Sequence, residues 1–256
     1  MNFKSQYLEL IKLSLMDGLN APVAKNILSP QTLEEQSTDQ WFDHFWLGKA
    51  LTMCSQKRLD NVQFCIESCV QNQVPGDLIE CGAWRGGVAV LMRAVLAAYQ
   101  ISNRIVWVAD SFQGLPQPNN DLDQKMYQMS AVQKIDFFSV SLPTVEANFY
   151  RYGLLDKQVQ FLPGWFADTL PLAPISALSV LRIDSDFYES TMQSLMSLYP
   201  KLSIGGYIII DDWGLDHICG EKAAVLAYRQ QHGITDPIIE IDYHSAYWQK
   251  SDSLPA

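Results

Sequence analysis

The chain has 256 residues, of which 48% are hydrophobic and 18% charged, so a sizeable core is expected and disorder is not. This length suits one large α/β domain with an added N-terminal segment. The 18 basic and 28 acidic side chains leave a net charge of −10, which argues against nucleic acid and anionic membranes as partners. Small molecules are therefore the expected partners.

The cysteines and the first residues indicate a soluble, cytoplasmic protein. The five cysteines form no C-x-x-C pair of the kind that binds zinc, and we expect them to be buried free thiols in a reducing cytoplasm. Glu9 and Lys12 interrupt the apolar residues near the start, so no signal peptide is expected. No apolar run approaches the roughly 20 residues that a membrane span needs.

Helices are expected before the first strand. Residues 3–19 and 58–70 carry apolar side chains at helical spacing, whereas residues 21–39 are polar and resemble a connector. Residues 41–51, read WFDHFWLGKAL, are rich in aromatic side chains. We expect the segment 1–73 to form a helical cap on the acceptor side of a pocket, with core packing alone as the alternative.

A glycine turn follows the first expected strand. Residues 77–81 are a short, mostly apolar run, and residues 88–99 carry apolar side chains at helical spacing. The turn reads Glu80-x-Gly82-x-x-x-Gly86, which is neither the G-x-G-x-x-G of dinucleotide enzymes nor a phosphate loop with its Lys-Ser/Thr. Such a turn suits a cofactor without a pyrophosphate, such as S-adenosylmethionine, although it could also be a tight strand-to-helix connection.

The next strand is expected at residues 104–110 and ends in Asp110. In doubly wound sheets an acid at the end of the second strand reaches the ribose hydroxyls of a bound nucleoside. The polar segment that follows has no clear strand, and we interpret residues 118–148 as a lid over the substrate, with a helix at residues 145–152.

A third strand, at residues 159–162, leads into a Pro-Gly turn. Trp165 could stack on an adenine ring, and Asp168 could bond its amino group, because ligands bind at the carboxyl ends of such strands. The alternative is a turn with a tryptophan that packs in the core.

The strands expected at residues 178–183 and 207–210 are each followed by a pair of carboxylates. A doubly wound sheet would place these pairs side by side, where they would repel each other unless a cation balances them. Oxygen ligands without histidine or cysteine favour magnesium, with calcium or manganese as substitutes, although an isolated Asp-Asp is usually a solvated turn. The acids are Asp184, Asp186, Asp211 and Asp212.

The last elements complete one catalytic α/β domain. Helices are expected at residues 192–199 and 219–231, and strands at residues 238–243 and 246–250 joined by a short turn. The predicted fold is a mostly parallel sheet flanked by helices and finished by an antiparallel pair of strands.

Several long motifs together resemble the macrocin O-methyltransferase family. They read VPGDLIECGAWRGGVAVLMR, RIVWVADSFQGLP, NFYRYGLLDKQVQFLPGWFADTLP, LRIDSDFYEST and LYPKLSIGGYIIIDDW. Enzymes of this family methylate sugar hydroxyls on macrolide and aminocoumarin antibiotics with S-adenosylmethionine and magnesium. The resemblance implies a Rossmann-like class I methyltransferase domain over residues 74–256, a sheet of seven strands and a homo-oligomer. The implied acceptor is a small, sugar-like molecule with neighbouring hydroxyls.

The resemblance also implies roles for individual residues. Asp184 would be the general base as well as a metal ligand. The cofactor loop would comprise Glu80, Cys81, Gly82, Trp84 and Gly86; the ribose would meet Asp110 and Ser111; the adenine would lie near Gly164, Trp165 and Asp168; and the metal would be held by Asp184, Asp211 and Asp212.

Alternatives and departures from the family pattern stay open. Asp186 or His217 could take the proton instead. The acceptor could be a catechol or another small diol, and a silent sugar- or nucleoside-binding protein is a third reading. Ser185 stands where the family usually has glycine, and Trp213 where Tyr or Phe is commoner, so Trp213 could line the acceptor pocket.

Overall fold

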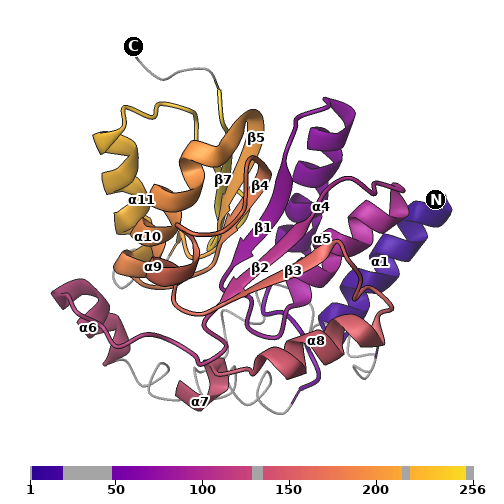
Figure 1. Ribbon diagram of the computed structural model, residues 1–256, viewed down its shortest axis with the longest axis horizontal. Coiled ribbons are helices and arrows are strands. Elements are labelled where there is room, and N and C mark those ends of the chain that lie inside the picture. The colour runs from indigo at the N-terminus through magenta and orange to yellow at the C-terminus, as the bar shows by residue number, and fades with distance from the viewer. Residues whose placement is uncertain (1, 20–47, 129–134, 215–219, 252–256) are drawn as a thin grey trace.

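The computed structural model describes residues 2–19, 48–128, 135–214 and 220–251, and seven strands within them form one sheet (Figure 1). The strand order is β3-β2-β1-β4-β5-β7-β6. Strands β1 to β5 run parallel, β7 runs antiparallel to β5, and β6 runs antiparallel to β7. The predicted parallel sheet with a C-terminal antiparallel pair is confirmed. The strands are β1 Asp77–Cys81, β2 Val106–Asp110, β3 Val159–Pro163, β4 Leu178–Ile183, β5 Leu202–Ile210, β6 Ile239–Glu240 and β7 Ala246–Gln249.

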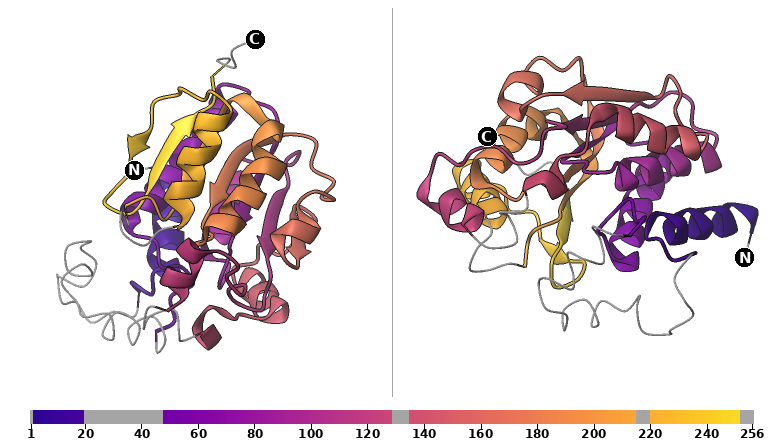
Figure 2. Two further views of the ribbon diagram at one scale, coloured as in Figure 1. Left: turned by 90° about the vertical axis from the view of Figure 1, so that its left-hand side faces the viewer. Right: turned by 90° about the horizontal axis from the view of Figure 1, so that it is seen from below.

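Helices cover both faces of this sheet. Helices α1, α4 and α5 lie on one face, and α9, α10 and α11 lie on the other, as Figures 1 and 2 show. Helices α6 and α7, which follow β2, lie along the lower edge of the molecule in Figure 1. None of the described helices has the length and apolar character that crossing a membrane requires. The α-helices are α1 Phe3–Leu15, α4 Gln56–Gln71, α5 Gly87–Ala98, α6 Asp121–Tyr127, α7 Ile135–Phe138, α8 Leu142–Arg151, α9 Phe166–Thr169, α10 Tyr188–Leu198 and α11 Gly220–Gln231, with a 3-10 turn at Tyr199–Lys201.

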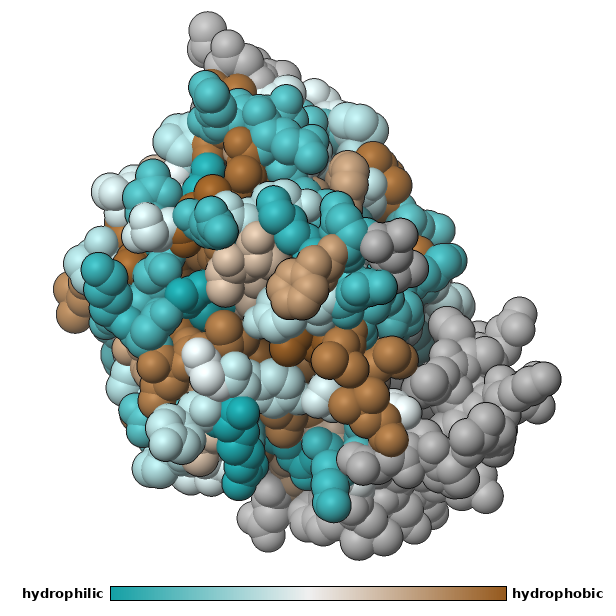
Figure 3. Space-filling model, turned by 90° about the vertical axis from the view of Figure 1, so that its right-hand side faces the viewer, coloured by the Kyte–Doolittle hydropathy of each residue, from teal (hydrophilic) through white to brown (hydrophobic). Residues whose placement is uncertain are grey.

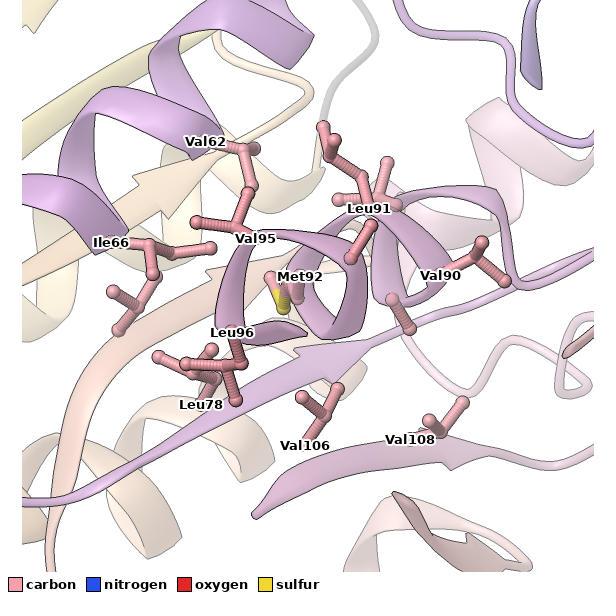
Figure 4. Close-up of a cluster of buried hydrophobic side chains, with 14 of the residues drawn as sticks. Val62, Ile66, Leu78, Val90, Leu91, Met92, Val95, Leu96, Val106 and Val108 are labelled. Atoms are coloured by element: carbon pink, nitrogen blue, oxygen red, sulfur yellow. The ribbon is translucent and has the colours of Figure 1, made fainter. Parts of the chain in front are cut away.

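Alternating side chains of the strands build two cores. Successive residues of a strand point to opposite faces, so Leu78 packs towards α4 and α5, whereas Ile79 joins the core beneath α10 and α11. Figure 4 shows the first core, in which α5 residues such as Leu96 lie between Ile66 of α4 and Val106 of β2. Both faces of the parallel strands are therefore buried, as such sheets require.

The N-terminal helix belongs to the same core. Asn2 caps α1 by accepting a hydrogen bond from the Ser5 amide at 2.9 Å, and Leu8 and Leu15 are buried against α5. The helix ends at Leu15 rather than at the predicted Leu19, because Asp17 has a positive φ of 59° that stops the helical path. The expected connector at residues 21–39 and most of the aromatic stretch at residues 41–51 lie outside the described residues.

Two predicted strands have different lengths in the structure. Strand β5 begins at Leu202 instead of residue 207, because Leu202 already pairs with Leu178 of β4. The register then shifts before Tyr207, across an irregular stretch in which Gly205 has a φ of +80°. The strand predicted at residues 238–243 is only Ile239–Glu240. There, Asp242 accepts hydrogen bonds from the amides of His244 and Ser245, at 2.9 and 3.0 Å, and this turn ends the strand early.

The segment interpreted as a lid contains α6, α7 and part of α8. Asp123 of α6 is buried and accepts hydrogen bonds from the amides of Tyr188 and Glu189, at 2.6 and 3.2 Å. These amides open α10, which therefore begins four residues before the predicted start at Met192. At least one end of this segment is thus fixed to the main fold.

Replacing Asp123 with alanine is expected to lower the free energy of unfolding by about 1–2 kcal/mol, because α10 loses its cap and α6 its anchor. Urea denaturation measures this loss. Asp121→Ala is the matched control, since Asp121 is exposed on the same helix and its removal should cost less than about 0.5 kcal/mol. Equal losses in the two variants would show that the cap contributes nothing.

Candidate active site

The carboxyl ends of β1, β2, β4 and β5 meet at one edge of the sheet. Hydrogen bonds continue between these strands one residue past their ends. The Gly82 amide donates to the Ala109 carbonyl at 2.9 Å, the Asp184 amide to Cys81 at 2.9 Å, and the Asp211 amide to Ile183 at 3.0 Å. The glycine turn and the two predicted pairs of acids are therefore brought together.

The glycine turn lies directly against the first pair of acids. Gly82 has a φ of +86°, and a Cβ atom at this position would lie 1.7 Å from the Asp184 carbonyl oxygen. Gly86 has a φ of +83° and begins α5 without a side-chain cap. Glycine is required at Gly82 both for its backbone conformation and for this close approach.

Glu80 supports the turn from beneath. Its side chain is buried, one carboxylate oxygen accepts from the Ala89 amide at 2.8 Å, and the other pairs with Arg182 at 2.7 Å. Ala89 lies in the first turn of α5, so Glu80 supplies the cap that Gly86 cannot. Burial raises the pKa of Glu80, whereas the Arg182 guanidinium at 2.7 Å opposes this shift and favours the charged carboxylate.

Asp110 also holds the turn in place. Its carboxylate accepts hydrogen bonds from the amides of Ala83 at 2.7 Å, Trp84 at 3.1 Å and Phe112 at 2.7 Å. The neighbouring Ser111 hydroxyl donates to the Gly114 carbonyl at 2.8 Å. Asp110 and Ser111 therefore shape the loops on which a cofactor would lie, while their predicted contact with a ribose remains a prediction.

Two other residues predicted in the cofactor loop have buried side chains. The Cys81 side chain packs in the core beneath α10, so only its backbone reaches the site edge. The Trp84 indole donates to the Phe137 carbonyl of α7 at 2.9 Å, and the two rings lie 5.2 Å apart. Trp84 thereby joins the glycine turn to the segment interpreted as a lid.

The loop after β3 lies on the other side of β2. The Gly164 amide donates to the Asp110 carbonyl at 2.9 Å, which fixes this loop beside the end of β2. Trp165 is 37% exposed, and Asp168 lies exposed in the short helix α9. An exposed ring at a strand end favours ligand contact over the alternative of a core tryptophan.

Three carboxylates form a cluster at the ends of β4 and β5. Asp184, Asp211 and Asp212 each offer an oxygen, and these oxygens lie within 4.8 Å of one another. Hard oxygen donors at this separation fit a divalent cation such as magnesium. These three acids are the metal ligands that the family resemblance implies, whereas the strand-end pattern alone also included Asp186.

The guanidinium groups of buried Arg182 and partly buried Arg58 hold Asp211 in its charged form. Arg182 lies 2.7 Å from one Asp211 oxygen and 2.9 Å from Asp184, while Arg58 of α4 lies 2.9 Å from the other Asp211 oxygen. Arg58 also pairs with Asp242 at 3.1 Å. Burial alone would raise the pKa of Asp211, but the two arginines outweigh it and lower that pKa to about 2.

Glu221 shapes the backbone beneath the cluster. One of its oxygens accepts from the Ser185 amide at 2.8 Å, and the other accepts from the amides of Asp211 at 3.1 Å and Asp212 at 3.3 Å. Ser185 also forms a hydroxyl contact with Thr191 at 2.8 Å, so the serine in place of the family's glycine is accommodated within this network. Burial, followed by the charge of Asp184, raises the pKa of Glu221 to about 8.

Negative charge exceeds positive charge in this region. Burial and neighbouring acids raise the pKa of Asp184 to about 7 and that of Asp212 well above its usual range, while burial raises the pKa of Asp186 to about 6. Such upward shifts are expected where carboxylates lack enough cationic partners. Besides Asp242, the described residues of this region contribute six carboxyl groups and two guanidinium groups, so the donor set and its charge both fit a bound divalent cation. The six acids are Glu80, Asp184, Asp186, Asp211, Asp212 and Glu221.

Sequence reasoning missed several residues of this network. Arg182 interrupts an otherwise apolar strand, as the predicted Glu80 does on the neighbouring strand, and this was a signal that the two could be paired. Arg58 and Glu221 carried no comparable signal. Trp213 is only 8% exposed and packs in the core beneath α10 and α11, which favours a packing role over lining the acceptor pocket.

In the absence of divalent metal, stability is expected to fall as pH rises from about 5 to about 8. Glu221 has an unperturbed pKa of 4.5 and a folded pKa of about 8, so in this window its carboxyl group is ionised in the unfolded protein and protonated in the folded one. The folded state then binds more protons, and raising the pH favours unfolding. Thermal unfolding in a chelator across this range is the measurement.

Glu221→Gln is the matched variant for this pH dependence, because it removes this titrating group. Its melting temperature should fall less between pH 5 and 8 than that of the wild type. A wild-type melting temperature that rises across the window would contradict the assignment.

Comparisons with known proteins agree with this geometry. The macrocin O-methyltransferase (TylF) family model matches residues 7–250. The chain is 44% identical over 250 residues to the mycinamicin III 3''-O-methyltransferase of Micromonospora griseorubida, with 96% of each protein covered. It is 45% identical over 245 residues to the 8-demethyl-8-(2,3-dimethoxy-alpha-L-rhamnosyl)-tetracenomycin-C 4'-O-methyltransferase of Streptomyces olivaceus, which covers 95% of this chain and 92% of that relative.

A solved structure shows the same fold. The O-methyltransferase NovP matches with a TM-score of 0.82 at 42% identity, over 97% of this chain and 99% of NovP. The sheet and its helices are therefore a Rossmann-like methyltransferase fold. Together with the family match over most of its length, this shows that the chain is an O-methyltransferase of the macrocin O-methyltransferase family.

Proposed function

We propose that the protein transfers a methyl group from S-adenosylmethionine to a hydroxyl of a sugar or sugar-bearing natural product, in a reaction that requires magnesium. The observation that carries this proposal is the direct contact between the glycine turn and the three-carboxylate cluster, at Gly82 and Asp184. A cofactor held on the turn and an acceptor held at the cluster would be neighbours, as transfer between them requires.

The proposed cofactor lies across the ends of β3, β2 and β1. Trp165 and Asp168 would meet the adenine, Asp110 and Ser111 the ribose, and the turn from Gly82 to Gly86 the methionine end. The strand order supports this assignment, because β3, β2 and β1 are consecutive neighbours and β4 follows with the acids. The sulfonium methyl of such a cofactor is already activated for transfer.

The proposed metal ligands are Asp184, Asp211 and Asp212. When bound there, magnesium would lower the pKa of an acceptor hydroxyl and fix its orientation. Arg58 and Arg182 keep Asp211 ionised, so this ligand is ready at neutral pH. Glu221 holds the amides of Asp211 and Asp212 and thus sets the direction of both side chains.

Asp184 is the proposed general base. Its side chain is 31% exposed, so its carboxylate can meet an acceptor hydroxyl and accept the proton from it. Arg182 fixes one oxygen of Asp184 and so orients the carboxylate. Asp186, whose pKa is about 6, is the alternative within the described residues, whereas His217 lies outside them.

The proposed acceptor is sugar-like, with neighbouring hydroxyls. The tetracenomycin relative is named for an acceptor that carries a rhamnosyl group, which supports a sugar for this chain. We assign the segments 1–73 and 118–148 to the acceptor side of the site. Trp84 supports this for the second segment, because it ties α7 to the glycine turn.

We also propose a cytoplasmic homo-oligomer. The four described cysteines are free and buried, which suits a reducing compartment. The α1 residues Phe3 and Leu10 are 83% and 53% exposed, and Figure 3 shows brown apolar areas among hydrophilic ones on one side of the molecule. Light scattering of Phe3→Ser and Leu10→Ser variants beside the wild type tests whether α1 lies in an interface.

The decisive experiment is calorimetric titration of S-adenosylhomocysteine, with and without magnesium, followed by methyl-transfer assays. A rhamnoside with free neighbouring hydroxyls and caffeate, a catechol, serve as the two acceptors. Transfer to the rhamnoside that stops in a chelator supports the proposal. Transfer to caffeate alone would favour a catechol or another small diol as the acceptor. Undiminished transfer in the chelator would show that the reaction does not require magnesium. Cofactor binding without transfer to any acceptor tried would favour a silent binding protein.

A further inference from the structure

Arg182 lies at the centre of the sheet, between the two halves of the proposed site. Its strand, β4, pairs with β1 on one side and β5 on the other, and Arg182 is the direct register partner of Glu80. The side chain is 1% exposed, so its charge must be balanced by groups inside the protein.

One guanidinium group contacts acids from both halves. Its Nη1 atom lies 2.7 Å from Glu80, on the side of the glycine turn. Its Nη2 atom lies 2.7 Å from Asp211 and 2.9 Å from Asp184, on the side of the metal cluster, and 3.1 Å from the Cys54 thiol. The two terminal nitrogens of the planar guanidinium group therefore contact two different binding regions.

The contact to Glu80 continues into the helix that follows the glycine turn. The second oxygen of Glu80 accepts from the Ala89 amide of α5 at 2.8 Å. A continuous set of buried, charge-assisted contacts thus runs from the start of α5 through Glu80 and Arg182 to Asp211. Contacts of this kind are strong and sensitive to the charge of each partner.

We propose that Arg182 is a positioning residue that couples cofactor binding at the glycine turn to magnesium binding at the carboxylate cluster. This inference rests on the proposed function. With a divalent cation on Asp184 and Asp211, Arg182 loses part of its attraction to their oxygens and interacts more strongly with Glu80. Glu80 then holds the start of α5 more firmly, and the turn that would receive the cofactor is better ordered.

The coupling must act in both directions. If magnesium raises the affinity for the cofactor product S-adenosylhomocysteine by some factor, that ligand raises the affinity for magnesium by the same factor. A factor of about 10 lies within the range typical of coupled sites. Neither titration depends on methyl transfer.

Three variants separate the coupling from the strength of each site. Arg182→Lys keeps the positive charge, but the single ammonium group of lysine cannot contact Glu80 and Asp211 as the two terminal nitrogens of a guanidinium group do. Glu80→Gln removes the charge on the cofactor side and leaves the three-carboxylate cluster intact. Arg58→Lys is the matched control, because Arg58 contacts Asp211 at 2.9 Å without contacting Glu80.

The test is calorimetric titration of S-adenosylhomocysteine, without and with saturating magnesium, for the wild type and the three variants. We expect magnesium to tighten binding about tenfold in the wild type and in Arg58→Lys, and to have almost no effect in Arg182→Lys and Glu80→Gln. A wild-type ratio of one, or a tenfold ratio that persists in both of the latter variants, would overturn the inference while leaving the proposed function intact.

Two further outcomes are covered by the same design. If Arg182→Lys does not fold, Glu80→Gln alone decides, because it cuts the same set of contacts at its other end. If the wild type binds neither S-adenosylhomocysteine nor magnesium, the proposed function fails and the inference fails with it.

Discussion

Gly82→Ala is expected to abolish binding of S-adenosylhomocysteine and to destabilise the fold strongly. The new Cβ would lie 1.7 Å from the Asp184 carbonyl oxygen, and 2.8 Å from its carbonyl carbon, so the ends of β1 and β4 must separate. This movement breaks the hydrogen bond from the Asp184 amide to Cys81 and displaces a proposed metal ligand together with the turn. A loss of about 4 kcal/mol or more is expected, which is the range of severe single substitutions.

Thermal and urea unfolding measure the stability loss, and calorimetry with S-adenosylhomocysteine and magnesium measures binding. Gly153→Ala is the matched control, because Gly153 also has a positive φ, +67°, but nothing lies within 4 Å of its Cβ position. That variant should lose only about 1–2 kcal/mol, from backbone strain, and should bind both ligands normally. If both variants lose the same stability, the close approach to Asp184 has no energetic role.

Local patterns predicted most of the strands and their common edge. The run 77–81 is bounded by Pro75-Gly76 and Gly82, and β1 has the predicted ends. The convergence of Asp184, Asp211 and Asp212 was also predictable, because neighbouring parallel strands end at the same edge of a sheet.

Long-range contacts explain what the sequence did not reveal. Helix α10 begins early because Asp123, more than 60 residues away, caps it. The turn beside the cofactor loop is held by Glu80 and Asp110, whose predicted roles were direct contacts with a ligand. Arg58 reaches Asp211 across 153 positions, and no local pattern could show that pairing.

The network of buried charges changes how the candidate site is understood. The sequence places four acids at two strand ends, and a bound metal was predicted because these acids would otherwise repel one another. The structure adds Arg58 and Arg182, which neutralise part of that charge and hold Asp211 from two sides. Because these arginines leave carboxyl groups in excess, their presence is compatible with a divalent cation at the cluster.

Asp212→Asn is expected to lower methyl transfer by roughly a thousandfold or more, because Lewis-acid and orienting contributions of a metal are worth several kcal/mol. Asp212 belongs to the three-carboxylate cluster, whereas Asp211 makes the ion pairs with Arg58 at 2.9 Å and Arg182 at 2.7 Å, and these pairs are kept in the variant. The variant should therefore stay folded and bind S-adenosylhomocysteine, while magnesium binding is lost. Steady-state assays and magnesium titration measure the two effects.

Two further variants, Asp211→Asn and Asp242→Asn, are measured beside Asp212→Asn. Asp211→Asn should lose the same activity and also stability, since buried Arg182 and partly buried Arg58 both lose a charged partner there. Asp242→Asn, which contacts Arg58 at 3.1 Å but is outside the cluster, should keep turnover within about tenfold of the wild type. If Asp212→Asn keeps near-normal turnover in a chelator, the cluster is not a metal site, and Asp184 would act as a simple general base beside the glycine turn.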